Sequence, residues 1–538
     1  MIQVYNTQAR QKEELQTVEP QKVRMYVCGP TTYNYIHLGN ARPLVVFDTV
    51  RRYLKYRGYD VTYVQNFTDV DDKIINRANE EGMGATELAQ RYIEEYFKDA
   101  DALNVMRADV HPKVSEHMVE IIDMVSVLID KGHAYEVDGD VYFRVSSFPS
   151  YGKLSGRDLE DMLAGARVEV DERKESPMDF ALWKKAKPGE PYWDSPWGQG
   201  RPGWHIECSA MSMKYLGGTL DIHGGGADLV FPHHENEVAQ SEAYTGQPFV
   251  RHWLHNGFIT VNKEKMSKSL GNFFIVRDIL DKFPSRVVRF YLLATHYRSP
   301  LDFDDGKLED AKRALERLQN CWRLLTDAEC EANDKESTPE ETKLLGQIDN
   351  IHVGFVEAMD DDFNTALGVS RVFEMVRLIN TSLAEGRLGS KAAIVQVKKT
   401  LYSLISDVLG IEIDIEVRVS SDSQLDATNA ISLVEAVINA LLQFRVELRN
   451  IKDYSTADRV RDLLSSQAII VEDSKEGSRF RFDTEPDINT LMSDVIALRQ
   501  ALRQEKNFTA ADLLRDSLTK AGIILEDTKE GCRWRIKD

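Results

Sequence analysis

A strand–loop–helix–strand pattern near the amino terminus is the feature that most constrains the fold. Residues 23–28 are strand-forming, and a Gly-Pro pair at 29–30 interrupts them. Apolar residues then recur at helical spacing over 38–57, and a second β-rich segment covers 60–67. Two strands separated by one helix predict parallel pairing through a right-handed crossover. The sequence therefore predicts a Rossmann-like α/β fold that binds its ligands at the carboxyl ends of the strands.

The length of the chain requires more than one domain. It has 538 residues, whereas a single hydrophobic core stops growing near about 250–300 residues. We predict the Rossmann-like domain over 1–300, with an inserted subdomain at about 115–200, where turns, prolines and tryptophans gather. Helical periodicity from about 305 onward predicts a helical stem and bundle over 301–420.

The last part of the chain contains an internal repeat with a constant offset of 54 residues. Segment 454–462 matches 508–516, and later blocks match at the same offset. Several matching blocks at one offset indicate a duplication. Each copy has the pattern of two short helices and a hairpin, so we predict small α+β units over 425–483 and 486–538.

Basic residues recur between the two copies. Those of the first copy are Arg445, Arg449, Lys452, Arg459 and Arg461, and four of the five keep their charge 54 positions later. Phe480 and Trp534 stand between arginines. Cations combined with aromatic faces suit unpaired RNA bases. A helix face with solvated charges is the alternative interpretation.

The overall charge excludes a protein that coats nucleic acid without selectivity. The net charge is −20, from 67 basic and 87 acidic residues, and non-specific binding is driven by phosphate neutralisation.

The five cysteines are few and odd in number, which favours a reducing compartment without disulfides. No leader-like start or long apolar run is present. We expect a cytoplasmic protein with no membrane partner.

The loop after the first predicted strand has features of a phosphate site. It runs from Cys28 to Asn40 and ends where the first helix begins. A helix start offers free N–H groups to phosphate, and Gly39 would let a nucleotide approach the backbone. His37 could donate a hydrogen bond to a phosphate oxygen. Taken alone, the segment is explained as well by a helix cap with an incidental histidine.

A lysine-rich loop follows much later, from Lys265 through Ser267 and Lys268 to Ser269. Two lysines three residues apart with hydroxyls between them can close over a triphosphate and neutralise the departing pyrophosphate. A solvated lysine turn is the alternative interpretation.

Cysteine, histidine and glutamate side chains supply candidate zinc ligands. His233 and Glu237 are four residues apart, which places them on one face of a helix. Cys28 and Cys208 are thiol donors, and thiolate, imidazole and carboxylate are all normal zinc ligands. A buried cysteine that only packs in a core is the simpler alternative. The rival histidine ligands are His205, His223 and His234.

Together these motifs resemble those of class I aminoacyl-tRNA synthetases. The first loop resembles their His-Ile-Gly-His element, with Asn40 in the fourth place, and 265–269 is identical to their Lys-Met-Ser-Lys-Ser element. Asn40 still donates a hydrogen bond but cannot carry charge. Within this class, six segments resemble cysteinyl-tRNA synthetase in order and spacing: 26–29, 66–73, 203–208, 224–229, 231–237 and 265–269.

This resemblance implies roles for particular residues. It implies one zinc ion per chain, bound by Cys28, Cys208, His233 and Glu237. It implies a substrate pocket formed by Cys28, Gly29, Asn66, Thr68, Trp204 and Asp228. It implies an ATP site formed by His37, Gly39, Asn40, Lys265, Ser267 and Lys268. The catalytic residues among these would be His37, Asn40, Lys265 and Lys268.

The resemblance also implies the reaction. L-Cysteine would be activated with ATP to cysteinyl-adenylate and pyrophosphate, and the cysteinyl group would pass to the 3′ end of tRNA(Cys). Zinc would bind the substrate thiol, which a serine hydroxyl cannot imitate, and magnesium would accompany ATP. We expect a monomer.

Two alternatives share parts of this pattern. One is the cysteine ligase of mycothiol biosynthesis, and the other is a tRNA-binding paralogue without catalysis. The family usually carries one anticodon-binding unit, so the second copy is a departure.

Overall fold

The computed structural model describes residues 1–158, 172–261, 264–265, 274–332, 337–413, 427–467, 469–474, 477–482, 488–528 and 531–536. It divides into two compact units, Met1–Asp414 and Ile415–Asp538. Each unit has its own hydrophobic core.

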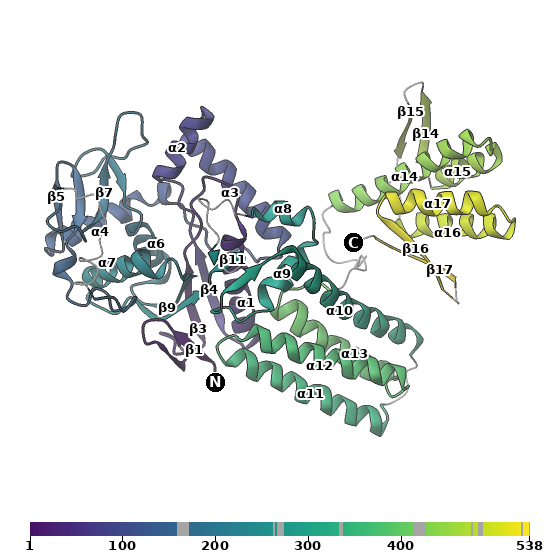
Figure 1. Ribbon diagram of the computed structural model, residues 1–538, viewed down its shortest axis with the longest axis horizontal. Helices are drawn as coiled ribbons and strands as arrows, with labels where there is room; N and C mark the ends of the chain where they lie inside the picture. Colours follow the sequence, from purple (N-terminus) through teal and green to yellow (C-terminus); the bar gives the residue numbers. More distant parts are fainter. Residues whose placement is uncertain are drawn as a thin grey trace. The chain divides into compact units, whose positions relative to one another are not determined.

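A four-stranded parallel sheet lies at the centre of the first unit (Figure 1). Its strand order is β10-β9-β3-β4, and every neighbouring pair is parallel. The strands are β3 (Lys22–Val27), β4 (Asp60–Gln65), β9 (Leu220–Gly226) and β10 (Val250–Asn256). Helix α1 (Leu38–Tyr56) connects β3 to β4 and packs against the sheet. The predicted parallel α/β architecture is confirmed.

Shorter elements surround this sheet. An antiparallel pair precedes it, and a three-stranded sheet, β12-β11-β13, follows it. The strands are β1 (Gln3–Asn6), β2 (Gln11–Glu14), β11 (Ile259–Val261), β12 (Glu264–Lys265) and β13 (Leu301–Phe303). The helices after β4 are α2 (Asp72–Glu81), α3 (Ala85–Ala102) and the 3-10 turn η1 (Val114–Glu116).

A second sheet is inserted between β4 and β9. It is antiparallel with the order β5-β6-β7-β8, and it lies on the far side of the parallel sheet from helices α10–α13 in Figure 1. Its strands are β5 (Ala134–Val137), β6 (Asp140–Phe143), β7 (Phe180–Lys185) and β8 (Gly200–Pro202). The accompanying helical elements are α4 (Met118–Asp130), η2 (Val145–Ser147), α6 (Ile206–Leu216), η3 (Val230–His234) and α7 (Glu235–Thr245).

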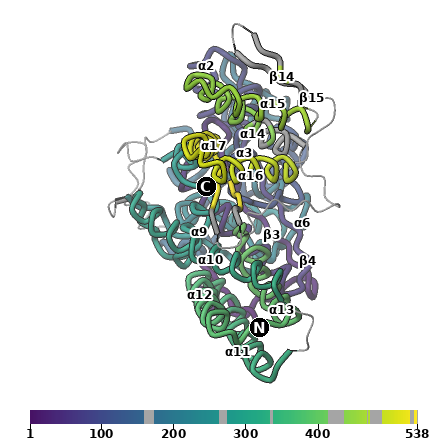
Figure 2. The backbone as a smooth tube through the Cα atoms, turned by 90° about the vertical axis from the view of Figure 1, so that its right-hand side faces the viewer, coloured from purple at the N-terminus to yellow at the C-terminus, as the bar shows by residue number. Residues whose placement is uncertain are grey.

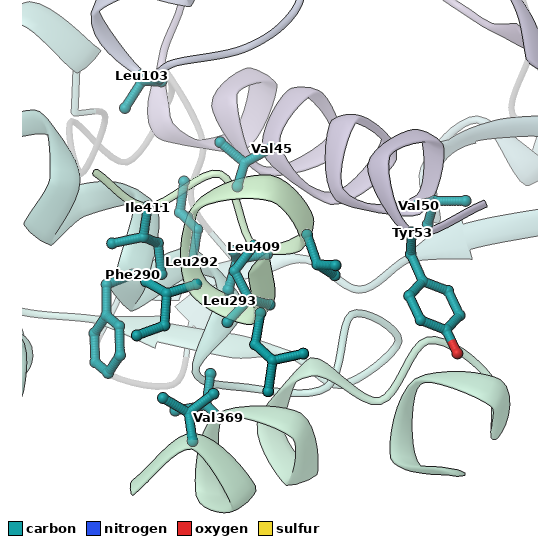
Figure 3. Packing of buried hydrophobic residues seen from close by; sticks show 14 of the residues in the cluster. Val45, Val50, Tyr53, Leu103, Phe290, Leu292, Leu293, Val369, Leu409 and Ile411 are labelled. Carbon is teal, nitrogen blue, oxygen red and sulfur yellow. The ribbon is translucent and has the colours of Figure 1, made fainter. Parts of the chain in front are cut away.

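Helices complete the first unit. They are α8 (Val276–Leu280), α9 (Ser285–Leu293), α10 (Asp305–Glu331), α11 (Pro339–Asp360), α12 (Thr365–Ala384), α13 (Lys391–Tyr402) and the π-helical turn η5 (Ser403–Val408). Their core is continuous with that of the parallel sheet. In Figure 3, Val45 of α1 faces Leu293 and Leu409, and Val369 lies beyond them. The sheet and the helical part therefore form one packed body.

A buried arginine links the same elements. Arg289 of α9 is 1% exposed and donates to the carbonyl oxygens of Leu409 and Leu103 over 2.8 and 2.9 Å. It also pairs with Asp48 of α1. Because an unpaired buried charge is costly, this arrangement fixes how the helices meet the sheet.

The second unit contains the two copies of the repeat, each built as two helices and an antiparallel hairpin (Figure 2). The first copy is α14 (Ala427–Asn450), α15 (Tyr454–Ser466), β14 (Ile469–Ser474) and β15 (Gly477–Phe482). The second copy is α16 (Ile488–Gln504), α17 (Phe508–Lys520), β16 (Ile523–Thr528) and β17 (Gly531–Ile536). The copies share one hydrophobic core, so they form a single folded unit and not two separate domains.

Part of the interpretation of the repeat's cations is wrong. Arg445 and Arg499 are only 5% and 3% exposed, so they belong to the core face of their helices. Arg449, Lys452, Arg503 and Lys506 are exposed. The side chains of 479–481 lie outside the described residues.

Candidate active site

A cavity of about 420 Å³ opens at the carboxyl ends of the parallel strands. Residues that follow β3, residues at and after the end of β9, and the start of α1 form its wall. The predicted site residues that line it are Cys28, Gly29, His37, Gly39, Asn40, Trp204 and Asp228. This is the edge of the sheet at which parallel α/β folds bind ligands.

Five metal-binding side chains gather at one end of this cavity. Sγ of Cys28 lies 3.6 Å from Sγ of Cys208, 3.5 Å from Nε2 of His233 and 3.5 Å from Oε1 of Glu237. Nε2 of His234 lies 3.4 Å from the same sulfur. The donor atoms of Cys28, His233, His234 and Glu237 are all within 4.8 Å of one another. Five candidate donors therefore converge, one more than the four that a tetrahedral zinc ion takes.

The cluster is buried except at Cys28. Cys208, His233, His234 and Glu237 are at most 2% exposed, whereas Cys28 is half-buried and lines the cavity. Cys28 is thus the donor through which a molecule in the cavity would meet the cluster.

The cluster contains charged groups of both signs, while burial raises the pKa of the Cys28 thiol well above its usual range. The hydrogen bond from Cys28 lowers the pKa of the Cys208 thiol to about 6. Burial would raise the pKa of Glu237, but the charges of His223 and His233 outweigh it and lower that pKa to about 2. Burial would lower the pKa of His233, but Glu237 and Cys208 outweigh it and raise that pKa to about 10. A thiolate and a carboxylate are both ligand forms for a divalent cation, and an ion bound at Nε2 of His233 would take the place of the proton there.

Further histidines orient the donors. Nδ1 of His205 lies 3.0 Å from Nδ1 of His233, and burial lowers the pKa of His205 well below its usual range. Nδ1 of a neutral His205 can accept a hydrogen bond from the Nδ1–H of His233, which leaves Nε2 of His233 directed at the cluster. In the same way, Nδ1 of His234 lies 2.7 Å from Nε2 of His255.

The glycine run at the end of β9 makes room for these rings. A Cβ on Gly225 would lie 2.7 Å from Cε1 of His234, and one on Gly224 would lie 2.5 Å from the Phe47 ring. A side chain at 225 would displace His234, and one at 224 would displace Phe47 of α1, which explains why glycine occupies both positions.

The amide of Asn66 supports the cavity wall beside Cys28. Its Oδ1 accepts the Gly29 N–H over 2.9 Å, and a Cβ on Gly29 would lie 1.6 Å from the Asn66 carbonyl oxygen. Nδ2 of Asn66 is buried without a partner in the described part of the chain. Neither Asn66 nor Thr68 is in the cavity wall; the Thr68 hydroxyl donates to buried Glu207 over 3.0 Å.

At the start of α1, His37 and Asn40 both cap the helix and face the cavity, as the two interpretations of this loop, a helix cap and a phosphate site, would each require. Nδ1 of His37 accepts the Asn40 N–H over 3.2 Å, and Oδ1 of Asn40 accepts the His37 N–H over 3.3 Å. The two residues therefore form a reciprocal cap. They also line the cavity, so the cap holds them at its edge.

One structural support was missed by sequence reasoning. Arg42 is fully buried, and its guanidinium donates to the carbonyl oxygens of Gly257 and Phe258 over 2.8 and 2.9 Å and to that of Ser299. Burial lowers its pKa to about 10. Gly257 and Phe258 line the cavity near His37. An arginine in a helical pattern is normally interpreted as a surface charge, so no sequence signal points to this role.

Most of the predicted lysine loop lies outside the described residues, including Ser267 and Lys268. The backbone of Lys265 belongs to β12 and pairs with Thr260 of β11. Ile259, at the start of β11, lines the cavity. The hairpin thus begins at the cavity and leads into the lysine loop.

Among the described residues, no helix has the length and apolar character needed to span a bilayer.

Three family models match successive parts of the chain. The "tRNA synthetases class I (C) catalytic domain" matches residues 14–313. The "DALR domain" matches 354–414, and the "Cysteinyl-tRNA ligase anticodon binding domain" matches 485–535. The last match falls on the second copy of the repeat.

Curated relatives align over nearly their whole length. A cysteine–tRNA ligase of Carboxydothermus hydrogenoformans is 60% identical over 482 residues, which cover 89% of this chain and 100% of the relative. Another of Pelotomaculum thermopropionicum is 61% identical, covering 89% and 99%. The chain therefore exceeds these relatives by about a tenth of its length, close to one 54-residue repeat.

Solved structures share the fold at low sequence identity. A methionyl-tRNA synthetase of Mycobacterium tuberculosis with methionyl-adenylate superposes with a TM-score of 0.53 at 16% identity, covering 72% of this chain and 89% of that one. An Agrobacterium radiobacter LeuRS–tRNA–LeuAMS complex gives 0.56 at 12% identity, covering 75% and 85%. These likenesses show a class I synthetase architecture.

Proposed function

The chain belongs to the cysteine–tRNA ligase family, and we propose that its Cys28, Cys208, His233 and Glu237 bind one zinc ion that selects cysteine by its thiol. The enzyme uses ATP to activate cysteine and transfers it to tRNA. The observation that carries the proposal is the position of Cys28, which touches every other donor of the cluster and also lines the cavity.

The donor set explains how the ion would choose its substrate. Two thiolates, an imidazole and a carboxylate are all zinc ligands, and the bound ion would supply a Lewis acid that accepts the substrate sulfur as thiolate. Serine offers a harder and far less acidic oxygen. One strong specific bond lets the site reject serine without editing.

His234 is assigned to the support of the site rather than to the ion. Its Nε2 lies 4.0 Å from Oε1 of Glu237, whereas Nε2 of His233 lies 3.0 Å from the same oxygen. Sγ of Cys208 lies 3.6 Å from Sγ of Cys28, and thiolate is a normal zinc donor, so the proposal gives the fourth place to Cys208.

The rest of the cavity would bind the substrate backbone and ATP. Asn66 holds Gly29, and Trp204 and Asp228 line the wall where the amino-acid portion would lie. The proposed contact of Thr68 with the substrate would require its hydroxyl, which donates to Glu207, to be shared with the ligand. His37, Gly39 and Asn40 would bind phosphate at the start of α1, and Lys265, Ser267 and Lys268 would close over the triphosphate. Magnesium would accompany ATP.

Two displacement steps follow from this arrangement. A carboxylate oxygen of cysteine attacks the α-phosphorus of ATP, and pyrophosphate leaves. The 3′-terminal ribose hydroxyl of tRNA(Cys) then attacks the adenylate carbonyl carbon, and AMP leaves. No side chain needs to act as a nucleophile, so the protein contributes positioning and charge stabilisation. We further propose a cytoplasmic monomer.

Cysteine-dependent exchange of pyrophosphate into ATP tests the proposal, with serine as the control substrate and metal content measured on the same protein. We expect one zinc per chain and exchange with cysteine only. Selectivity for cysteine in metal-free protein would overturn the zinc assignment. The match of an anticodon-binding model favours tRNA over an amino sugar as acceptor, which charging assays check directly.

A further inference from the structure

Residues 296–299, between α9 and β13, run along the back of the cavity wall. The carbonyl oxygen of Tyr297 accepts the Gly257 N–H over 2.8 Å. A Cβ on Gly257 would lie 2.5 Å from the carbonyl oxygen of Ser299, so the two backbones are in close contact. Gly257 and Phe258 both line the cavity. The position of this part of the wall therefore depends on the segment behind it.

Three side chains of the same segment contact one buried carboxylate, that of Asp362. The Tyr297 hydroxyl donates to Oδ1 over 2.8 Å, and Nε of Arg298 donates to Oδ2 over 2.6 Å. Nε2 of His296 lies 3.5 Å from Oδ2, and the Tyr5 N–H donates to Oδ1 over 2.8 Å. Asp362 is 0% exposed. Because a buried charge must be paired, this carboxylate fixes the segment in one place.

Asp362 belongs to the turn between α11 and α12, and the backbone of that turn is strained. The angle φ is 65° at Asp362 and 50° at Phe363, both in the left-handed region. Aspartate tolerates this conformation, whereas a bulky side chain rarely adopts it. The Phe363 ring is 1% exposed and packs edge-on against Tyr53 of α1 at a centroid distance of 6.2 Å. Strain of this kind persists only where surrounding contacts hold it.

Arg42 joins the segment to the cavity wall from within the core. Its guanidinium donates to the carbonyl oxygens of Gly257 and Phe258 in the wall. It also donates to the carbonyl oxygens of His296 and Ser299 in the segment. The wall, the segment and Asp362 are thus connected by an unbroken series of hydrogen bonds.

We propose that Asp362 is a positioning residue for the ATP site. It lies behind the cavity wall and not in it, and it acts by holding residues 296–299, which hold Gly257 and Phe258. The turn between α11 and α12 would thereby complete a nucleotide site whose other parts come from the Rossmann-like domain. This inference rests on the proposed function, which places ATP in the cavity.

Asp362→Asn in the full-length chain tests the proposal. The amide keeps one acceptor oxygen but cannot pair with the donors of both Tyr297 and Arg298. We expect the KM for ATP in cysteine-dependent pyrophosphate exchange to rise about tenfold, as for loss of one hydrogen bond to a charged group. The kcat, the KM for cysteine and the zinc content should change little, because the wall contributes binding and not chemistry.

Asp221→Asn is the matched control for loss of stability. Asp221 is also 0% exposed, and its carboxylate accepts the N–H groups of Val18 and Arg24 over 2.6 and 2.7 Å. It lies near the start of β9, at the opposite end of the strand from the cavity. This variant should lower the melting temperature and leave the KM for ATP unchanged.

A milder variant covers the case in which Asp362→Asn does not fold. Tyr297→Phe removes only the hydroxyl that donates to Asp362, and we expect it to raise the KM for ATP about threefold. The double variant of Arg42→Lys with Tyr297→Phe adds a second measurement. Because both substitutions loosen the same wall, their combined effect on the KM for ATP should be smaller than the product of the single effects.

An unchanged KM for ATP in Tyr297→Phe overturns the proposal, and so does an increase in Asp221→Asn equal to that in Asp362→Asn. Multiplying effects in the double variant would also overturn it. The Kd for ATP is measured by calorimetry on the same proteins, independently of turnover. A wild-type protein that binds ATP without cysteine-dependent exchange would count against the proposed function, whereas equal ATP affinity in wild type and the Asp362 variant would count against the role of Asp362.

Discussion

The buried imidazole of His223 donates from Nε2 to Oε2 of Glu237 over 2.9 Å, while Oε1 of the same carboxylate faces His233 at 3.0 Å. His223 stacks on Trp253 at a ring-centroid distance of 4.6 Å and an interplanar angle of 20°. One carboxylate oxygen is thereby held in the protein, and the other is presented to the cluster. Supporting groups of this kind fix the direction of metal ligands.

Replacing His223 should therefore weaken metal binding without removing a ligand. We expect His223→Gln to lower zinc affinity about 10- to 100-fold. Competition with a chromogenic chelator measures the change. A variant with wild-type affinity would show that His223 only packs against Trp253.

Cys208→Ser should remove zinc and selectivity together. The substitution replaces a thiolate donor with a hydroxyl that does not ionise near neutral pH. We expect less than one zinc per chain by elemental analysis and a reduced preference for cysteine over serine in exchange assays. Cys321→Ser, at a buried thiol of α10 far from the cluster donors in sequence, is the control and should keep its metal. Full metal content in Cys208→Ser would refute its assignment as a ligand.

Arg42→Lys should raise the KM for ATP more than it lowers kcat. Lysine keeps the charge but cannot reach the carbonyl oxygens of Gly257, Phe258 and Ser299 at once, so the cavity wall near His37 should loosen. We expect an increase in the KM for ATP of about tenfold, from the loss of roughly 1.4 kcal/mol of binding energy. The KM for cysteine should change little. Equal increases in the KM for ATP and the KM for cysteine would point to general destabilisation of the protein.

His111 should make stability depend on pH in a defined window. Its Nδ1 lies 3.0 Å from the Gln65 carbonyl oxygen, its Nε2 accepts the Ala108 N–H over 3.1 Å, and its ring stacks on Phe67. Burial lowers its pKa from 6.5 to about 4. The folded state thus excludes a proton that the unfolded chain binds. Stability from this group is present above pH 6.5 and lost as the pH falls toward 4.

Denaturant unfolding at several pH values checks this expectation. His111 should contribute a slope of at most about 1.4 kcal/mol per pH unit within that window. His111→Gln keeps a donor and an acceptor but does not titrate, so its unfolding free energy should fall less steeply there. Parallel pH profiles for the two proteins would contradict the role of His111.

Local sequence patterns predicted the fold well and the supporting contacts poorly. The strand–helix–strand unit is encoded by apolar spacing within about 45 residues, and it appears as β3, α1 and β4. The roles of His205 and Arg42 depend on contacts with residues far along the chain. No local pattern distinguishes such groups from surface or core residues.

In the C-terminal unit, too, local sequence patterns did not predict contacts between distant residues. The offset of 54 predicted two similar units, but not that their helices would pack into one core. That packing buries Arg445 and Arg499, which a single amphipathic helix would have left on its polar face.

The common core of the tail also determines how the duplication could be undone. Buried side chains of the second copy, such as Leu491, Leu502 and Leu514, pack with those of the first, such as Leu441 and Val460. A cut between the copies would uncover apolar surface on the half that stays and invite aggregation. A deletion that shortens the chain is therefore expected to leave a well-folded protein only if it removes both copies together, upstream of α14.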